Sequence, residues 1–152
     1  MTKAEQYKQL IADMKLHIEG ETDEISVMAN VAAMLREEFG FFWVGFYIVR
    51  NGLLHLGPFQ GSPACYRIRY GKGVCGTAWK AERTQIVADV HTFEGHIACS
   101  SLSQSEIVVP VFNDEKEVMA VLDIDSDQLN SFDTVDKEYL EQVCSLMSAV
   151  IY

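Results

Sequence analysis

The dipeptide Asn51-Gly52, which lies between two apolar segments, restricts the fold of this chain more than any other feature. Asn-Gly favours the left-handed backbone of a two-residue hairpin turn, so residues 41–50 and 53–57 are predicted to pair as antiparallel strands. A polar turn also joins the apolar residues 106–112 to residues 117–124, which predicts a second hairpin. The middle of the chain is therefore expected to form an antiparallel sheet.

Shorter segments lie between the two hairpins. Residues 66–70 and 85–88 are predicted as short strands, and a short helix over 74–80 follows a glycine-rich turn. Residues 89–104 are predicted to form a long loop, and a structureless loop of this length is uncommon unless it has a function. Pro110 lacks an N–H group, so its strand is expected to be an edge strand or to be irregular there.

Apolar residues recur at helical spacing in three further segments, which predicts three long helices. These are residues 2–18, a segment from Thr22 or Asp23 to about residue 38, and a segment from Asp133 or Thr134 to the C-terminus. Hairpin strands flanked by terminal helices predict an α+β fold, with one domain spanning residues 1–152. Its antiparallel sheet has about six strands, with the N- and C-terminal helices on one face and ligand-binding loops on the other.

The formal net charge of −10 argues against nucleic acid and anionic membranes as partners, because both would repel the protein. No apolar run reaches the roughly 18 residues that a membrane span requires. The amphipathic N-terminus lacks the apolar stretch of a signal peptide, so the cytoplasm is the expected location, where thiols are normally reduced. An apolar N-terminal helix is also compatible with a homodimer.

Three of the four cysteines lie close together in the sequence, and Cys75 belongs to the glycine-rich turn 71–76. At the first turn of a helix, a thiol is exposed to the positive end of the helix dipole and to unpaired N–H groups. Both are expected to lower the pKa of Cys75 and to favour its thiolate. The alternative is that Cys75 is a small buried apolar residue behind the turn.

The other cysteines differ in their surroundings. Cys99 lies in the long loop three residues after His96, which either assists the thiol as a base or is only a structural hydrogen-bonding group. Cys65 lies in a loop with glycine and proline, where it has the mobility of a thiol that condenses with an oxidised partner. Cys144 lies on or near the apolar stripe of the last helix and is assigned to the core.

A zinc site built from the three clustered cysteines and His96 is the competing interpretation of the same residues. Structural zinc ligands usually come in pairs, with two to four residues between the two cysteines. The gaps between these cysteines are 10 and 24 residues. No resident metal is therefore expected.

Three carboxylates in the second predicted hairpin are a candidate cation site. With a turn symmetric about residues 114 and 115, Glu106 lies opposite Asp123, and Asp125 points to the same face. Like charges directly opposed destabilise a sheet, so solvent, raised pKa values or a bound cation must compensate. The placement suggests a socket for an ammonium group, and a solvated strand end is the alternative.

The first predicted strand offers an aromatic wall. Trp43, Gly45 and Tyr47 alternate along the strand and project from one face. Two rings separated by a missing side chain would form a slot for an apolar or polarizable group such as a thioether. Taken alone, an aromatic pair at this spacing is more often part of the core.

Four motifs, which contain most of these residues, together resemble one protein family. The motifs are Gly-Lys-Gly-Val-Cys-Gly-Thr-Ala at 71–78, Gly-His-Ile-Ala-Cys at 95–99, Ser-Glu-Ile-Val-Val-Pro-Val at 105–111, and Val-Leu-Asp-Ile-Asp-Ser at 121–126. Together with the cysteine spacing, they closely resemble the free methionine-(R)-sulfoxide reductases, which are built on a stand-alone GAF domain. The resemblance implies a GAF-like fold.

The resemblance also implies a role for each candidate residue. Cys99 matches the catalytic thiol, Cys65 the resolving cysteine, and Cys75 a further thiol that assists or forms an alternative disulfide. The matches to the substrate-binding carboxylates and the aromatic wall are Glu106, Asp123, Asp125, Trp43 and Tyr47. Ser100 departs from the family, in which the residue after the catalytic cysteine is often acidic.

The function that the resemblance implies is reduction of free L-methionine-(R)-sulfoxide to methionine. Attack by Cys99 on the sulfoxide would produce a sulfenic acid, Cys65 would close a disulfide, and thioredoxin would restore both thiols with no bound cofactor. The alternative is a non-catalytic GAF sensor that binds a small ligand and reports cysteine oxidation. Turnover of the free sulfoxide distinguishes the two.

Overall fold

The computed structural model describes residues 1–96 and 99–152 and contains four α-helices, six strands and one 3₁₀ turn. In chain order these are α1 (Lys3–Ile18), α2 (Glu24–Phe39), β1 (Trp43–Arg50), β2 (Leu53–Gln60), β3 (Arg67–Arg69), α3 (Gly73–Ala81), β4 (Gln85–Val87), η1 (Val90–Thr92), β5 (Ser105–Phe112), β6 (Val118–Ser126) and α4 (Thr134–Ile151). The predicted α+β class is confirmed.

All strands belong to one antiparallel sheet with the order β3-β2-β1-β6-β5-β4. Asn51 and Gly52 both have positive φ angles, 51° and 75°, which is the backbone of the hairpin turn that their sequence predicts. The central strands β1 and β6 come from different hairpins and pair with each other. This pairing brings residues that are about 80 positions apart in the sequence, such as Trp43 and Asp125, to adjacent places.

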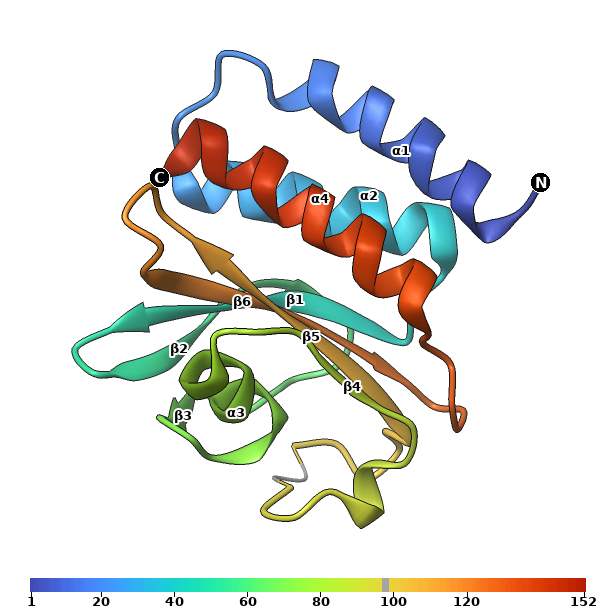
Figure 1. Ribbon diagram of the computed structural model, residues 1–152, viewed down its shortest axis with the longest axis vertical. Coiled ribbons are helices and arrows are strands. Elements are labelled where there is room, and N and C mark those ends of the chain that lie inside the picture. The colour runs from blue at the N-terminus through green and yellow to red at the C-terminus, as the bar shows by residue number, and fades with distance from the viewer. Residues whose placement is uncertain (97–98) are drawn as a thin grey trace.

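The helices lie in layers (Figure 1). α2 and α4 pack on one face of the sheet, α1 packs over them, and the short helix α3 lies on the opposite face with the long loops. Both terminal helices therefore lie on the same side of the sheet, as predicted, but α1 packs on α2 and α4 in an outer layer. Its apolar stripe is buried against the other helices through Tyr7, Leu10, Met14 and Ile18. That stripe is not free to bind a second copy, and the oligomeric state stays a prediction.

Pro110 lies where β5 changes from an interior strand to an edge. β4 pairs only with residues 106–108 of β5, so the outer side of β5 is unpaired at Pro110 among the described residues. A proline is tolerated at such a position because no neighbouring strand needs its N–H group.

The described residues between β4 and β5 match the predicted loop, apart from the turn η1. Val90 donates its N–H to the carbonyl of Gln104 (2.9 Å), and Gln104 donates to the carbonyl of Ser126 (2.7 Å), so both ends of the loop are attached to the sheet. Ile97 and Ala98 of the Gly-His-Ile-Ala-Cys motif lie outside the described residues. Among the helices that the structure describes, none has the length and apolar character needed to cross a bilayer.

Candidate active site

A small cavity of about 40 Å³ lies on the α3 side of the sheet and brings the predicted site residues together. Its walls come from β1, β5, β6, the start of α3, and the loops before β3 and β5. All site residues proposed from the sequence line the cavity except Cys65, which forms a disulfide with the lining residue Cys99. The proposed residues that line it are Trp43, Tyr47, Cys75, Cys99, Glu106, Asp123 and Asp125. His96 lines it as well.

The pairing of the acidic strands differs from the predicted register. Glu106 lies opposite Asp125, and Asp123 lies opposite Val108. The turn is one residue longer than predicted, with Lys116 in the left-handed conformation (φ 63°), and a further irregularity follows β5 residue Val111. The two changes shift the register by two positions in total, so the predicted Glu106–Asp123 pair is wrong.

The three carboxylates nevertheless share one face and form rows with β1. Asp125 on β6 lies between its partners Trp43 on β1 and Glu106 on β5. Gly45 and Asp123 form a second pair, two residues along from Trp43 on β1 and two residues along from Asp125 on β6. Glu106 and Asp123 are 6% and 5% exposed. The sheet therefore holds carboxyl groups in an apolar layer, where charged groups are costly unless they are paired.

Burial raises the pKa of all three carboxyls above the usual range, and Coulombic repulsion within the group raises those of Glu106 and Asp125 further. Within residues 1–96 and 99–152, no basic side chain forms an ion pair with any of them. Oδ1 of Asp123 is buried and has no hydrogen-bond partner among the described residues. The group has the chemistry of a cation site whose cation comes from outside the chain.

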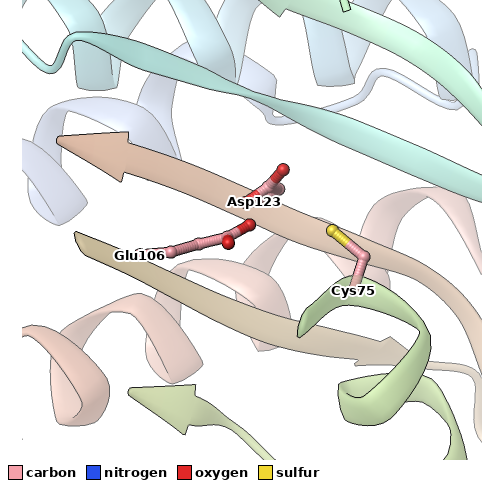
Figure 2. A group of neighbouring side chains, drawn as sticks. All are labelled: Cys75, Glu106 and Asp123. Atoms are coloured by element: carbon pink, nitrogen blue, oxygen red, sulfur yellow. The ribbon is translucent and has the colours of Figure 1, made fainter. Parts of the chain in front are cut away.

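Cys75 lies in the first turn of α3, as predicted, and is 4% exposed. Figure 2 shows its side chain directed toward Asp123 and Glu106 on the sheet below. The expected low pKa is wrong: burial, and then the negative charges of Asp123 and Glu106, hold the pKa of Cys75 well above its usual value. These effects outweigh the helix dipole, so Cys75 is a thiol in this environment rather than a thiolate.

A disulfide joins Cys65 and Cys99, whose Cα atoms are 5.5 Å apart. It connects the loop after β2 with the loop before β5, which are 34 residues apart in the chain. Aromatic residues of β1 hold the Cys65 loop: Tyr47 donates its O–H to the carbonyl of Cys65 (2.9 Å), and Trp43 donates its indole N–H to the carbonyl of Ser62 (2.9 Å). The two thiols that the resemblance assigns to catalysis and resolution are thus within bonding distance.

The slot predicted above Gly45 is filled. A Cβ atom on Gly45 would overlap Phe59 and the ring of Trp43, and the rings of Trp43 and Phe59 stack with centroids 5.2 Å apart. The centroids of Trp43 and Tyr47 are 6.3 Å apart. The aromatic residues therefore form one wall of the cavity rather than two sides of a slot. Phe59 was missed because β2 continues past Pro58, where the sequence predicted a loop.

His96 and Cys144 differ in their relation to the cavity. His96 lines it, and burial lowers the pKa of the imidazole, which favours the neutral ring at pH 7. Its Nδ1 is buried without a hydrogen-bond partner in the described part of the chain. Cys144 is buried in the core between α4 and the opposite face of the sheet, as predicted for a core residue.

Comparison with known proteins places this geometry in a family. Residues 21–151 match the GAF domain family. The free methionine-R-sulfoxide reductase of Escherichia coli is 41% identical over 99% of this chain and 92% of its own length. The chain belongs to the free methionine-R-sulfoxide reductase family of GAF-domain proteins. GAF domain-containing protein A of Dictyostelium discoideum, another relative, is 54% identical over 96% of this chain and 92% of its own.

A solved member of the reductase family has the same fold. The X-ray structure of free methionine-R-sulfoxide reductase from Neisseria meningitidis in complex with its substrate superposes with a TM-score of 0.95 at 46% identity. The match covers 98% of this chain and 90% of that chain. The predicted GAF fold is confirmed, since the match extends over the sheet and the helices on both faces.

The buried acids are expected to make the ligand-free protein less stable as pH rises. The pKa of Glu106 is raised in the folded protein, so the folded protein keeps a proton that the unfolded chain loses above about pH 4–5. Unfolding is therefore increasingly favoured as the pH rises above that value. Glu106→Gln removes this loss and is expected to raise Tm by roughly 2–4 °C at pH 8, with a smaller gain at pH 5.

Thermal unfolding of the variant at both pH values measures this effect. The exposed Glu115 lies in the turn after β5, so Glu115→Gln is the matched control and should leave Tm almost unchanged. A Glu106→Gln protein that is less stable than the wild type at pH 8 would show that the buried carboxylate stabilises the fold.

Proposed function

We propose that this protein reduces free L-methionine-(R)-sulfoxide to methionine, and that thioredoxin in the cytoplasm is its external reductant. The observation that carries the proposal is the Cys65–Cys99 disulfide beside a cavity lined by the carboxyls of Glu106, Asp123 and Asp125. A thiol pair of this kind suits an oxidoreductase, and the acids suit a small cationic substrate. The named reductases from E. coli and N. meningitidis support the same activity.

The reaction begins when the sulfur of Cys99 attacks the sulfoxide sulfur. The sulfoxide oxygen needs a proton before it can leave the substrate sulfur. A carboxyl with a raised pKa retains a proton near neutral pH, so Glu106 or Asp125 is suited to supply it. The protonated oxygen then moves from the substrate sulfur to the sulfur of Cys99 as the transient bond between the two sulfurs breaks, which releases methionine and leaves Cys99 as a sulfenic acid.

Cys65 completes the reaction within the chain. Its thiol attacks the sulfenic sulfur of Cys99, water leaves, and the disulfide seen in the structure forms. Two electrons and two protons from an external dithiol then restore both thiols. The net result is one methionine and one water for each dithiol oxidised.

The substrate ammonium group provides the cation that the acidic group lacks. It donates hydrogen bonds to carboxylate oxygens, including Oδ1 of Asp123, and it favours the ionised forms of the carboxyls that it contacts, while one of Glu106 and Asp125 keeps its proton for the sulfoxide oxygen. The aromatic wall of Trp43 and Tyr47 faces the same cavity and suits the polarizable S-methyl group. Binding energy from the amino group thus positions the sulfoxide against Cys99.

The direct test is NADPH consumption with thioredoxin and thioredoxin reductase. Free methionine-R-sulfoxide should support continuous oxidation of NADPH, and the S epimer should not. Binding of the R epimer without any NADPH consumption or methionine release would contradict the proposal and would favour the sensor alternative.

The acidic site predicts strong discrimination against sulfoxide within a polypeptide. N-acetyl-methionine-R-sulfoxide lacks the ammonium group and leaves buried carboxylates unpaired, which costs a few kcal/mol. Its kcat/KM is expected to be about 10²- to 10³-fold lower than that of the free amino acid. The methyl ester keeps the ammonium group and is the matched control, with a smaller loss. Equal kcat/KM for the free and N-acetylated substrates would contradict the ammonium socket.

A further inference from the structure

We propose that Cys75, Glu106 and Asp123 form a binding site for a thiophilic divalent cation, Zn²⁺ above all, and that this cation competes with the substrate. The site differs from the zinc site considered from the sequence, because Cys65 and Cys99 are bonded to each other and are not needed as ligands. Only the competition depends on the proposed function.

Three elements converge to supply the ligand atoms. The thiol comes from the first turn of α3, and the two carboxylates come from the neighbouring strands β5 and β6 (Figure 2). One sulfur and two carboxylate oxygens lie within 4.8 Å of one another. Ligands around Zn²⁺ at about 2.0–2.3 Å lie roughly 3.5 Å apart, so small side-chain rotations complete the geometry.

The unpaired oxygen of Asp123 is an independent indication of a ligand. This side chain is 5% exposed, and its Oδ1 has no hydrogen-bond partner among the described residues. A buried acceptor without a donor is costly, and a cation bound there removes the cost. No basic side chain of residues 1–96 and 99–152 forms an ion pair with Asp123 or Glu106.

The donor set and the space favour a metal ion of the zinc type. A thiolate with carboxylates suits Zn²⁺ better than Mg²⁺ or Ca²⁺, which take oxygen ligands, and three protein ligands leave the fourth position to water. The cavity of about 40 Å³ holds an ion and water, whereas a cavity that accepts benzene has about 150 Å³. The oxidised protein is thus suited to an ion.

Binding is an exchange of protons for metal. The ion displaces the proton of the Cys75 thiol and any proton held by the two carboxyls, so affinity should increase with pH. The metal and the substrate ammonium group require the same carboxylate oxygens, and therefore exclude each other. The expected outcome in the presence of Zn²⁺ is reversible inhibition that high substrate concentration overcomes.

Cobalt absorption of the disulfide form tests the site without any substrate. In that form only Cys75 and Cys144 are free thiols, so a thiolate-to-Co²⁺ charge-transfer band reports on one of these two. The band is expected in the wild type and in Cys144→Ala, and it should be lost in Cys75→Ala. One equivalent of Zn²⁺ per chain should remove the band, and Asp123→Asn should raise the Co²⁺ Kd about tenfold or more.

The outcomes separate the metal site from the catalytic activity. A band that persists in Cys75→Ala, or no band in the correctly folded wild type, overturns the site whether or not the protein reduces sulfoxide. If Cys75→Ala does not fold, Asp123→Asn provides the test instead, with its fold checked by circular dichroism. An unchanged Kd of Co²⁺ for Asp123→Asn also overturns the site. The competition is tested on the reduced protein, where Zn²⁺ should slow a single turnover of free methionine-R-sulfoxide at low substrate concentration, and inhibition that saturating substrate does not relieve overturns the competition.

Discussion

Cys99→Ser is expected to lower the turnover of free methionine-R-sulfoxide by about 10⁴-fold or more. A serine hydroxyl is a far weaker nucleophile toward sulfur, and its oxygen cannot accept the sulfoxide oxygen as sulfur does in a sulfenic acid. Substitution of a nucleophile in other enzymes has effects of this size or larger. Methionine released in the thioredoxin-coupled assay is the quantity to measure.

The matched control for this variant is Cys144→Ser. It also removes one thiol from the chain, but that thiol is buried on the other side of the sheet. Its activity per folded molecule should stay close to that of the wild type. If Cys99→Ser kept more than a few per cent of the wild-type rate, the nucleophile would have to be a different cysteine.

Cys65→Ser is expected to separate reduction of the substrate from recycling of the enzyme. The first turnover needs only Cys99, so the variant should release about one methionine per chain. The following steps should then be slower by about 100-fold, because an external thiol replaces one that is held beside the sulfenic acid. A rapid-quench assay, followed by trapping of the sulfenic acid with dimedone, measures both phases.

Cys75→Ser is the comparison that assigns the resolving thiol. Cys75 is buried in the first turn of α3, whereas Cys65 already bonds to Cys99, so Cys75→Ser should still form the disulfide and recycle. Full thioredoxin-coupled turnover by Cys65→Ser would exclude Cys65 as the resolving residue. Loss of recycling in Cys75→Ser alone would assign that role to Cys75.

The elements of the fold could be predicted because their signals are local. Asn51-Gly52 requires no knowledge of the rest of the chain to indicate a hairpin, and the helical spacing of Tyr7, Leu10 and Met14 indicates a buried stripe. The layer in which α1 lies could not be predicted this way. Its partners are other helices, and an apolar stripe does not specify the surface that it covers.

The three carboxyls lie together, as predicted, although the predicted register is wrong. Side chains alternate between the faces of a strand, so a shift of two positions changes the partner of Glu106 from Asp123 to Asp125 but leaves every carboxyl on the same face. A shift of one position would have moved Glu106 to the opposite face. The face of the sheet on which a side chain lies can thus be predicted more reliably than its partner on the neighbouring strand.

Two properties of the site depend on tertiary packing and could not be predicted. The space above Gly45 is occupied by Phe59 and Trp43, which requires β2 to continue beyond Pro58. The pKa of Cys75 is raised by its burial and by Asp123 and Glu106, which approach from two strands of the sheet, β6 and β5. The position of Cys75 in the first turn of α3 could be predicted, but not its electrostatic surroundings.

The most direct test of the central claim is a single turnover by the fully reduced protein without any recycling reductant. Racemic free methionine sulfoxide is added, methionine and the remaining epimers are measured by chiral chromatography, and the disulfide is located by peptide mapping. We expect one methionine per chain, loss of the R epimer alone, and a bond between Cys65 and Cys99. Release of no methionine, or oxidation that leaves Cys99 as a free thiol, would contradict it.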